Sequence, residues 1–165
     1  MRLRTSKPHR ALTPWRDEPS CSEATLRLVA RDLAAELVRG QHILLEGPMG
    51  AGKSTFARAL ISALDVSQLP EGSPSFAIAH EYDTSRGHLV HIDFYRINSE
   101  AEIEEAGLPT YFWERDDLVI TEWLANWPAF EKKVLETRSC WLVHLEFGSS
   151  SERQDLRYLK ISKNF

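Results

Sequence analysis

GPMGAGKS, at residues 47–54 of this 165-residue chain, matches the pattern G-x-x-x-x-G-K-[ST] without a mismatch. The pattern predicts a phosphate-binding loop, or P-loop, that joins a strand to a helix. Gly50, Ala51 and Gly52 are small, so the loop can wrap with successive backbone N–H groups directed at phosphate oxygens. We therefore expect these three residues to contact the phosphates of a bound nucleotide.

The next three residues carry side chains suited to the same ligand. Lys53 is expected to reach the β- and γ-phosphates, and the Ser54 hydroxyl to bind Mg²⁺. Thr55 is placed to contact an α- or β-phosphate. The helix that begins here presents free N–H groups and its positive dipole end to the same anion.

The flanking sequence supports this interpretation of the loop. Residues 42–46 form a short apolar-rich run typical of a strand, and a helix is predicted from Lys53 to about Leu64. The alternative is an ordinary glycine-rich turn between a strand and a helix. The correct setting on both sides favours nucleotide binding.

A P-loop nucleotidase also needs an acid at the end of a neighbouring strand, to hold Mg²⁺ or to orient water. Asp93 ends the run 88–92, and Glu122 ends the run 118–121. An acid at a strand end is usually a solvated turn residue, but the P-loop makes a functional role for at least one of them the better hypothesis. Spacing alone does not divide the roles between them.

Three further features lie near these motifs. Trp123 follows Glu122, and it either fills the core or packs against the nucleotide. Residues 73–76, Ser-Pro-Ser-Phe, either contact the γ-phosphate or cap a hairpin. His88 and His91 alternate along a strand, and we interpret them as structural.

The remaining pattern predicts an α/β, P-loop NTPase-like three-layer fold with a mixed parallel and antiparallel sheet. A βα start is followed by antiparallel-looking segments. The predicted elements are a helix capped by Ser22, a hairpin over 76–82 and 88–94, a short helix after Ser99, and strands over 141–147 and 156–161.

Charge and proline content divide the chain into two parts. Residues 1–20 carry five basic and two acidic residues with three prolines, which predicts a flexible basic N-terminal extension or, as a weaker alternative, an organellar transit peptide. Residues 21–165 carry 15 basic and 22 acidic residues and are expected to form one P-loop ATPase domain. A domain with this negative net charge is expected to bind nucleic acid poorly by direct contact.

Several classes of protein are disfavoured. No apolar run approaches the roughly 18–20 residues of a membrane span, and no secretory signal is present, so we expect a cytoplasmic protein without a membrane partner. Cys21 and Cys140 make neither a disulfide framework nor a metal cluster. The absence of Asn-Lys-x-Asp argues against a GTPase, and the absence of an acceptor-site motif weakens a small-molecule kinase.

The ordered motifs together resemble those of the TsaE (YjeE) family of small bacterial ATPases. The family's usual wording is close to G-D-L-G-A-G-K-T-T, S-P-T-F, H-x-D-L-Y-R and E-W-P. The matching stretches here are GPMGAGKST at 47–55, SPSF at 73–76, HIDFYR at 91–96 and EW at 122–123. The resemblance covers roughly residues 22–161.

The resemblance implies an ATPase needed for the threonylcarbamoyl modification of adenosine 37 in tRNA. The ligands implied are ATP or ADP and Mg²⁺, and the partners are TsaD-like and TsaB-like proteins, with tRNA contacted only indirectly. Two alternatives remain open: a small-molecule kinase that uses the same loop, and a nucleotide-switched binding module.

The resemblance also implies roles for single residues. Lys53 binds phosphates, while Ser54 and Glu122 hold Mg²⁺. Asp93 takes the family's essential aspartate position and belongs with Lys53 and Glu122 to the catalytic group. Ser75 supplies the hydroxyl of a switch-like loop in the nucleotide site. Trp123 lies beside the nucleotide.

Two departures from the family wording bear on these expectations. Pro48 replaces the familiar Asp and removes one loop N–H. After Trp123 the chain continues Leu-Ala-Asn-Trp-Pro, where the family has proline at once. These departures affect the loop geometry and the surface beside the site.

Overall fold

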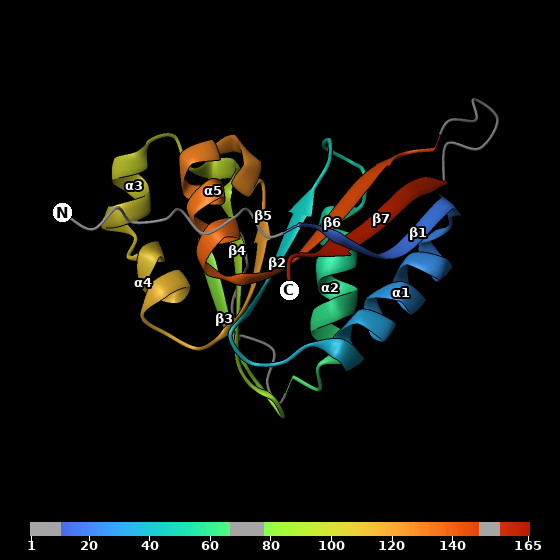
Figure 1. Ribbon diagram of the computed structural model, residues 1–165, viewed down its shortest axis with the longest axis horizontal. Coiled ribbons are helices and arrows are strands. Elements are labelled where there is room, and N and C mark those ends of the chain that lie inside the picture. Colours follow the sequence, from blue (N-terminus) through green and yellow to red (C-terminus); the bar gives the residue numbers. More distant parts are fainter. Residues whose placement is uncertain (1–10, 67–77, 149–155) are drawn as a thin grey trace.

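The computed structural model describes residues 11–66, 78–148 and 156–165. One seven-stranded sheet has helices on both faces, in a three-layer α/β arrangement (Figure 1). The strands are β1 (Thr13–Cys21), β2 (Gln41–Glu46), β3 (Ala79–Thr84), β4 (Gly87–Asp93), β5 (Leu118–Glu122), β6 (Ser139–Phe147) and β7 (Arg157–Lys163). The helices are α1 (Glu23–Glu36), α2 (Lys53–Ala63), α3 (Glu100–Glu105), α4 (Leu108–Trp113) and α5 (Pro128–Thr137), with the 3₁₀ turns η1 (Phe94–Arg96) and η2 (Leu124–Asn126).

The sheet has the order β1-β7-β6-β2-β5-β4-β3. The four central strands β6, β2, β5 and β4 are mutually parallel, whereas β3, β7 and β1 pair antiparallel at the two sides. The predicted mixed sheet is therefore confirmed. Because parallel strands share a direction, the carboxyl ends of β2, β4 and β5 meet at one edge.

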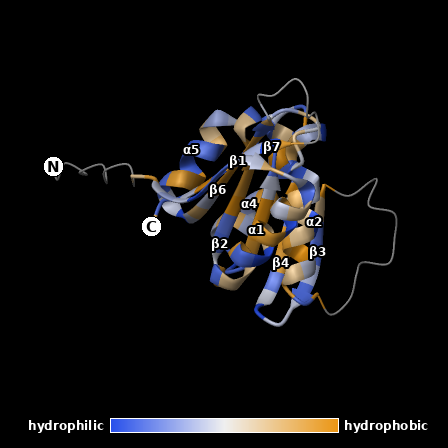
Figure 2. Ribbon diagram, turned by 90° about the vertical axis from the view of Figure 1, so that its right-hand side faces the viewer, coloured by the Kyte–Doolittle hydropathy of each residue, from blue (hydrophilic) through white to orange (hydrophobic). Residues whose placement is uncertain are grey.

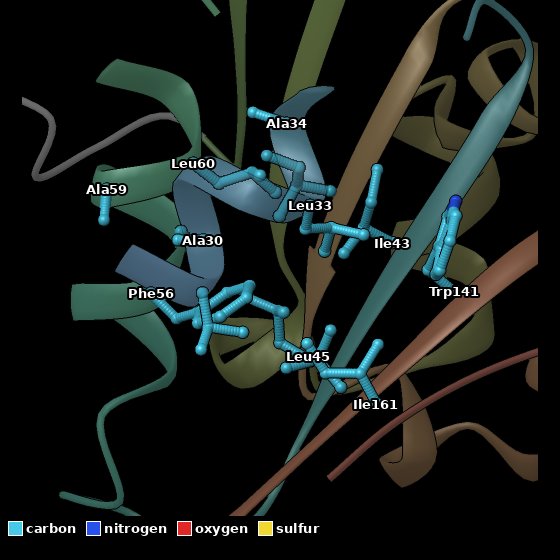
Figure 3. Close-up of a cluster of buried hydrophobic side chains, with 14 of the residues drawn as sticks. Ala30, Leu33, Ala34, Ile43, Leu45, Phe56, Ala59, Leu60, Trp141 and Ile161 are labelled. Carbon is cyan, nitrogen blue, oxygen red and sulfur yellow. The ribbon is translucent and has the colours of Figure 1, made fainter. Parts of the chain in front are cut away.

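Alternating residues of the central strands fill two separate cores. Ile43 and Leu45 pack under α1 and α2, whereas Leu44 faces the opposite core with α3, α4 and α5. Figure 3 shows the first core, where Leu33 of α1 and Leu60 of α2 lie against these β2 residues. Hydrophobic residues concentrate in the middle strands (orange in Figure 2), as expected for strands covered on both faces.

The helix boundaries follow local signals in the sequence. The Ser22 hydroxyl accepts a hydrogen bond from the Thr25 N–H at 3.2 Å and caps α1, as predicted. Ser99 caps α3 in the same way. Helices α4 and α5 were not predicted; each has a proline in its first turn, where the missing N–H costs nothing.

The first 20 residues require a correction. We expected a flexible extension over 1–20, but β1 begins at Thr13 and pairs antiparallel with β7 at the edge of the sheet. An edge strand tolerates Pro14 and Pro19, because one side of its backbone has no ladder partner, and the register shifts near both prolines. Residues 1–10 lie outside the described residues.

Some of the other predicted segments lie partly outside the described residues. The hairpin is present, with β3 beginning at Ala79; the residues predicted before it, including 73–76, lie outside the described residues. The late strands are β6 and β7, and the turn over 149–155 also lies outside. Within the described part of the chain, no helix is both long and apolar enough to cross a bilayer.

Candidate functional site

The loop between β2 and α2 is shaped by its glycines. Gly47 has φ +131°, and a Cβ atom there would lie 1.9 Å from the carbonyl oxygen of Leu145 on β6. Gly52 has φ +104° and immediately precedes the first residue of α2. Only glycine adopts these backbone angles without strain, so the turn that directs the loop across the end of the sheet requires this residue type.

Lys53 lies beneath this loop and is buried. Its Nζ donates hydrogen bonds to the carbonyl oxygens of Gly47 at 2.7 Å and Pro48 at 2.9 Å. The same Nζ lies 3.6 Å from the centre of the Trp123 ring, within cation–π distance. Burial lowers the pKa of Lys53, while the charges of Glu122 and Asp93 act in the opposite direction.

Glu122 is almost fully buried at the carboxyl end of β5 and is held through both of its oxygens. The Ser54 hydroxyl donates to Oε2 at 2.8 Å, and His91 Nε2 lies 2.9 Å from Oε1. Burial raises the pKa of Glu122. The hydrogen bonds of His91 and Ser54, with the nearby positive charges, outweigh this effect and hold the pKa below its usual value.

Ser54 and Glu122 fit a magnesium ion by their chemistry. Mg²⁺ prefers oxygen ligands in a near-octahedral arrangement, and a hydroxyl and a carboxylate supply such oxygens. The Ser54 and Glu122 oxygens form a 2.8 Å hydrogen bond with each other, so they lie close enough together to contact one cation. Among the residues that the structure describes, no three His, Cys, Asp or Glu side chains form a metal cluster, so phosphate and water oxygens would complete the shell.

Asp93 lies beside Glu122 at the same sheet edge. The two residues are register partners on the parallel strands β4 and β5. Asp93 Oδ1 accepts a hydrogen bond from the Tyr95 N–H at 3.0 Å, and this contact caps η1. The turn directs the chain so that Tyr95 lies against Trp123, with 5.2 Å between ring centres.

These groups surround one cavity of about 310 Å³. Its lining combines loop backbone, two carboxylates and two aromatic rings. The lining residues are Met49, Gly50, Gly52, Lys53, Ser54, Thr55, Asp93, Tyr95, Glu122 and Trp123. The cavity therefore offers backbone N–H groups and a cation for phosphate, oxygen ligands for a metal, and an aromatic wall.

A second cavity of about 270 Å³ adjoins the first and shares three of its lining residues, Ser54, Asp93 and Glu122. Its other polar lining comes from Arg58 of α2, His80 and Tyr82 of β3, His91 of β4 and Arg96 of η1. Arg96 thus lines this neighbouring cavity rather than the P-loop cavity.

The structure brings most of the predicted site residues together. Gly50, Gly52, Lys53, Ser54, Thr55, Asp93, Glu122 and Trp123 line the P-loop cavity, and Ala51 is buried within the loop. The predicted Ser75 lies outside the described residues. The roles assigned to these residues remain predictions.

Two residues beside the site were not among the predicted site residues. The sequence indicates a structural role for His91, and the structure shows that its ring contacts the Glu122 carboxylate. Its spacing contained a signal, because residues i and i+2 of a strand share a face, and His91 stands two before Asp93. Tyr95 was not singled out, and its place depends on the 3₁₀ turn after Asp93.

Comparison with known proteins adds family information to this geometry. A sequence model described as threonylcarbamoyl adenosine biosynthesis protein TsaE matches residues 20–154. The chain is 38% identical over 100 residues to the tRNA threonylcarbamoyladenosine biosynthesis protein TsaE of Aquifex aeolicus, with 58% of this chain and 74% of that protein aligned. It is 36% identical over 136 residues to the protein of the same description from a Nostoc species, with 80% and 78% aligned.

A solved structure also has a similar fold. The crystal structure of Bacillus subtilis YdiB matches with a TM-score of 0.64 and 20% sequence identity. The match covers 94% of this chain and 88% of that one. At this identity the likeness concerns the fold alone.

Proposed function

The chain belongs to the TsaE family of threonylcarbamoyl adenosine biosynthesis proteins, and from that premise we propose that it is a Mg²⁺-dependent ATPase that drives this tRNA modification. The observation that carries the proposal is the pairing of Ser54 and Glu122 beside Lys53 in a single cavity under the P-loop. Two oxygens suited to a metal ion therefore stand next to a cation suited to phosphate.

The positions of these groups support the proposed binding of ATP. The N–H groups of the loop and of the N-terminus of α2 donate hydrogen bonds to the phosphate oxygens. The Lys53 ammonium is held by two loop carbonyls and the Trp123 ring. We infer that Lys53 exchanges one or more of these contacts for the β- and γ-phosphates, a stronger, charge-assisted interaction.

Hydrolysis would use the acids at the ends of β4 and β5. Mg²⁺ bound to Ser54 and Glu122 would supply positive charge beside the phosphates during phosphoryl transfer to water. We assign the orientation of the attacking water to Asp93, because its strand runs beside that of Glu122. Lys53 counters the charge that develops on the phosphate oxygens.

The partners follow from the family and from the charge of the chain. We propose that the protein acts in the cytoplasm with TsaD-like and TsaB-like proteins and meets tRNA only through them. Residues 21–165 carry a net charge of −7, which opposes direct contact with a polyanion. ATP hydrolysis would then keep a partner enzyme turning over, while the carbamoyl transfer takes place elsewhere.

The experiment that tests this function is a pair of measurements on the purified chain. Phosphate release from ATP is measured with Mg²⁺ and with EDTA, alone and after addition of TsaD-like and TsaB-like proteins from the same source. Mg²⁺-dependent release that rises with the partners supports the proposal. Failure to bind or cleave ATP under every condition would overturn it.

A further inference from the structure

His91 is the only described side chain other than Ser54 for which the structure gives a hydrogen bond to Glu122. It extends from β4, the strand beside β5, and its Nε2 lies 2.9 Å from Glu122 Oε1. The side chains are 15% and 3% exposed, so little solvent screens the contact. A short, sheltered contact of this kind restricts the orientation of a carboxylate.

The two oxygens of Glu122 have different neighbours. Oε2 faces the Ser54 hydroxyl in the P-loop cavity, whereas Oε1 faces His91. His91 lines the adjoining cavity and not the P-loop cavity. The imidazole therefore contacts the carboxylate oxygen that does not face the Ser54 hydroxyl.

This arrangement disfavours His91 as a metal ligand itself. Mg²⁺ prefers oxygen to nitrogen ligands, and the Nε2 atom is already engaged by the carboxylate. A side chain that contacts a metal-binding carboxylate instead fixes the orientation of that carboxylate. In metal sites such partners typically influence metal affinity by about 10–100-fold.

We propose that His91 is a positioning residue that holds the Glu122 carboxylate so that Oε2, together with the Ser54 hydroxyl, receives Mg²⁺. The inference rests on the proposed function, because it assumes that this pair binds the metal. When the Ser54 oxygen binds a cation, its hydrogen bond to Oε2 is weakened or lost. The contact of His91 with Oε1 then remains to keep the carboxylate from rotating.

A matched pair of substitutions separates positioning from packing. In H91Q the amide nitrogen extends about as far as Nε2 and can still donate to Glu122, whereas the shorter side chain of H91N cannot reach it. H88N is the control, because His88 lies on the same strand but is exposed and pairs with Asp83. Circular dichroism and thermal unfolding establish that each variant is folded.

The readout is metal binding rather than activity. Mn²⁺, a spectroscopic substitute for Mg²⁺, is titrated in the presence of ADP and followed by electron paramagnetic resonance. ADP affinity is measured separately in EDTA. We expect H91N to lose about tenfold or more in Mn²⁺ affinity with an unchanged ADP affinity in EDTA, H91Q to recover most of the loss, and H88N to match the wild type.

The outcomes distinguish the positioning role of His91 from the proposed Mg²⁺-dependent ATPase function. Wild-type Mn²⁺ affinity in H91N would overturn the positioning role and leave the proposed function standing. An equal loss in H91Q and H91N, or a matching loss of ADP affinity in EDTA, would assign His91 a merely structural role. If the wild-type chain bound no Mn²⁺ with ADP, the metal site of the proposed function would itself fail.

Discussion

The Ser54 hydroxyl donates a 2.8 Å hydrogen bond to Glu122, a residue 68 positions later in the chain. Ser54 is the second residue of α2, and Glu122 is the last residue of β5. The pair joins the P-loop to the neighbouring strand at the shared carboxyl edge of the parallel strands. The proposed metal chemistry depends on this contact.

Replacing Glu122 with Gln tests the metal side of the pair. The amide keeps the size of the side chain but removes the charge that favours Mg²⁺. We expect Mg²⁺-dependent ATP hydrolysis to fall about 100-fold or more, since a catalytic metal contributes several kcal/mol, while ADP still binds in EDTA. Phosphate release and calorimetric titration measure the two quantities, and normal hydrolysis would refute the role of Glu122.

Replacing Lys53 with Ala tests the phosphate side. The substitution removes the buried ammonium under the loop and leaves the carbonyls of Gly47 and Pro48 without that donor. We expect ATP binding to be lost within the range that calorimetry detects. Lys132→Ala is the control, because Lys132 lies on the exposed side of α5. An unchanged ATP affinity in the Lys53 variant would contradict the proposed site.

Substitution of Gly47 with Ala tests the shape of the loop. A Cβ at Gly47 would lie 1.9 Å from a backbone carbonyl, and the φ of +131° is itself strained for any other residue. Gly107→Ala is a matched control, because Gly107 also has positive φ (+67°) but has nothing within 4 Å of its Cβ position. We expect the control to cost about 1–2 kcal/mol of unfolding free energy and the Gly47 variant clearly more, with loss of nucleotide affinity. Equal costs in urea unfolding would show that the loop is not closely packed.

Trp15→Ala tests the edge strand β1. The Trp15 ring meets Trp141 edge to face, with 5.5 Å between ring centres, and packs on the core beneath α1. Removal of a partly buried tryptophan should lower the unfolding free energy by about 2–3 kcal/mol. Leu12→Ala, at an exposed position before the strand, should change it little. If Trp15→Ala were also neutral in denaturant unfolding, β1 would not be a stable part of the domain.

Glu131→Gln tests a carboxyl pair next to the P-loop. Burial raises the pKa of Glu131 to about 7, assisted by the charge of Glu46 and a hydrogen bond with it. Because the folded state binds this proton more tightly than the unfolded state does, protonation of Glu131 favours folding. This stabilisation is complete below the unfolded pKa of about 4.5 and is lost as the pH rises through the folded pKa of about 7. Stability from this group therefore falls between these two pH values.

The Glu131→Gln variant should not show this pH-dependent loss of stability. We expect Glu131→Gln to be more stable than the wild type by about 1–2 kcal/mol at pH 8, after allowance for solvent screening, and equal to it at pH 4.5. Urea unfolding at the two pH values measures the difference. The exposed Glu136→Gln on the same helix is the control. A difference that is independent of pH would show that Glu131 does not take up a proton on folding.

Local spacing in the sequence was enough to predict much of the site. The P-loop at 47–54 is a contiguous motif, and its glycines, lysine and hydroxyl act through the backbone geometry of a single turn and helix start. Asp93 and Glu122 could be nominated because each follows an apolar strand-forming run. Parallel pairing then places both at the same edge of the sheet.

The extent of β1 and the contact of His91 with Glu122 could not be derived in this way. Prolines and basic residues indicate an extension when they are read locally, but pairing with β7, some 140 residues later, supplies backbone hydrogen bonds that overcome this tendency. His91 resembles any histidine of a half-buried strand until β4 and β5 are placed side by side.

The sequence by itself determined that a P-loop follows a central strand, because that signal lies within a few bonds along the chain. Only the tertiary structure decided that one oxygen of Glu122 faces Ser54 and the other faces His91. These contacts depend on strand order and register, which arise from packing between residues that are distant in the chain.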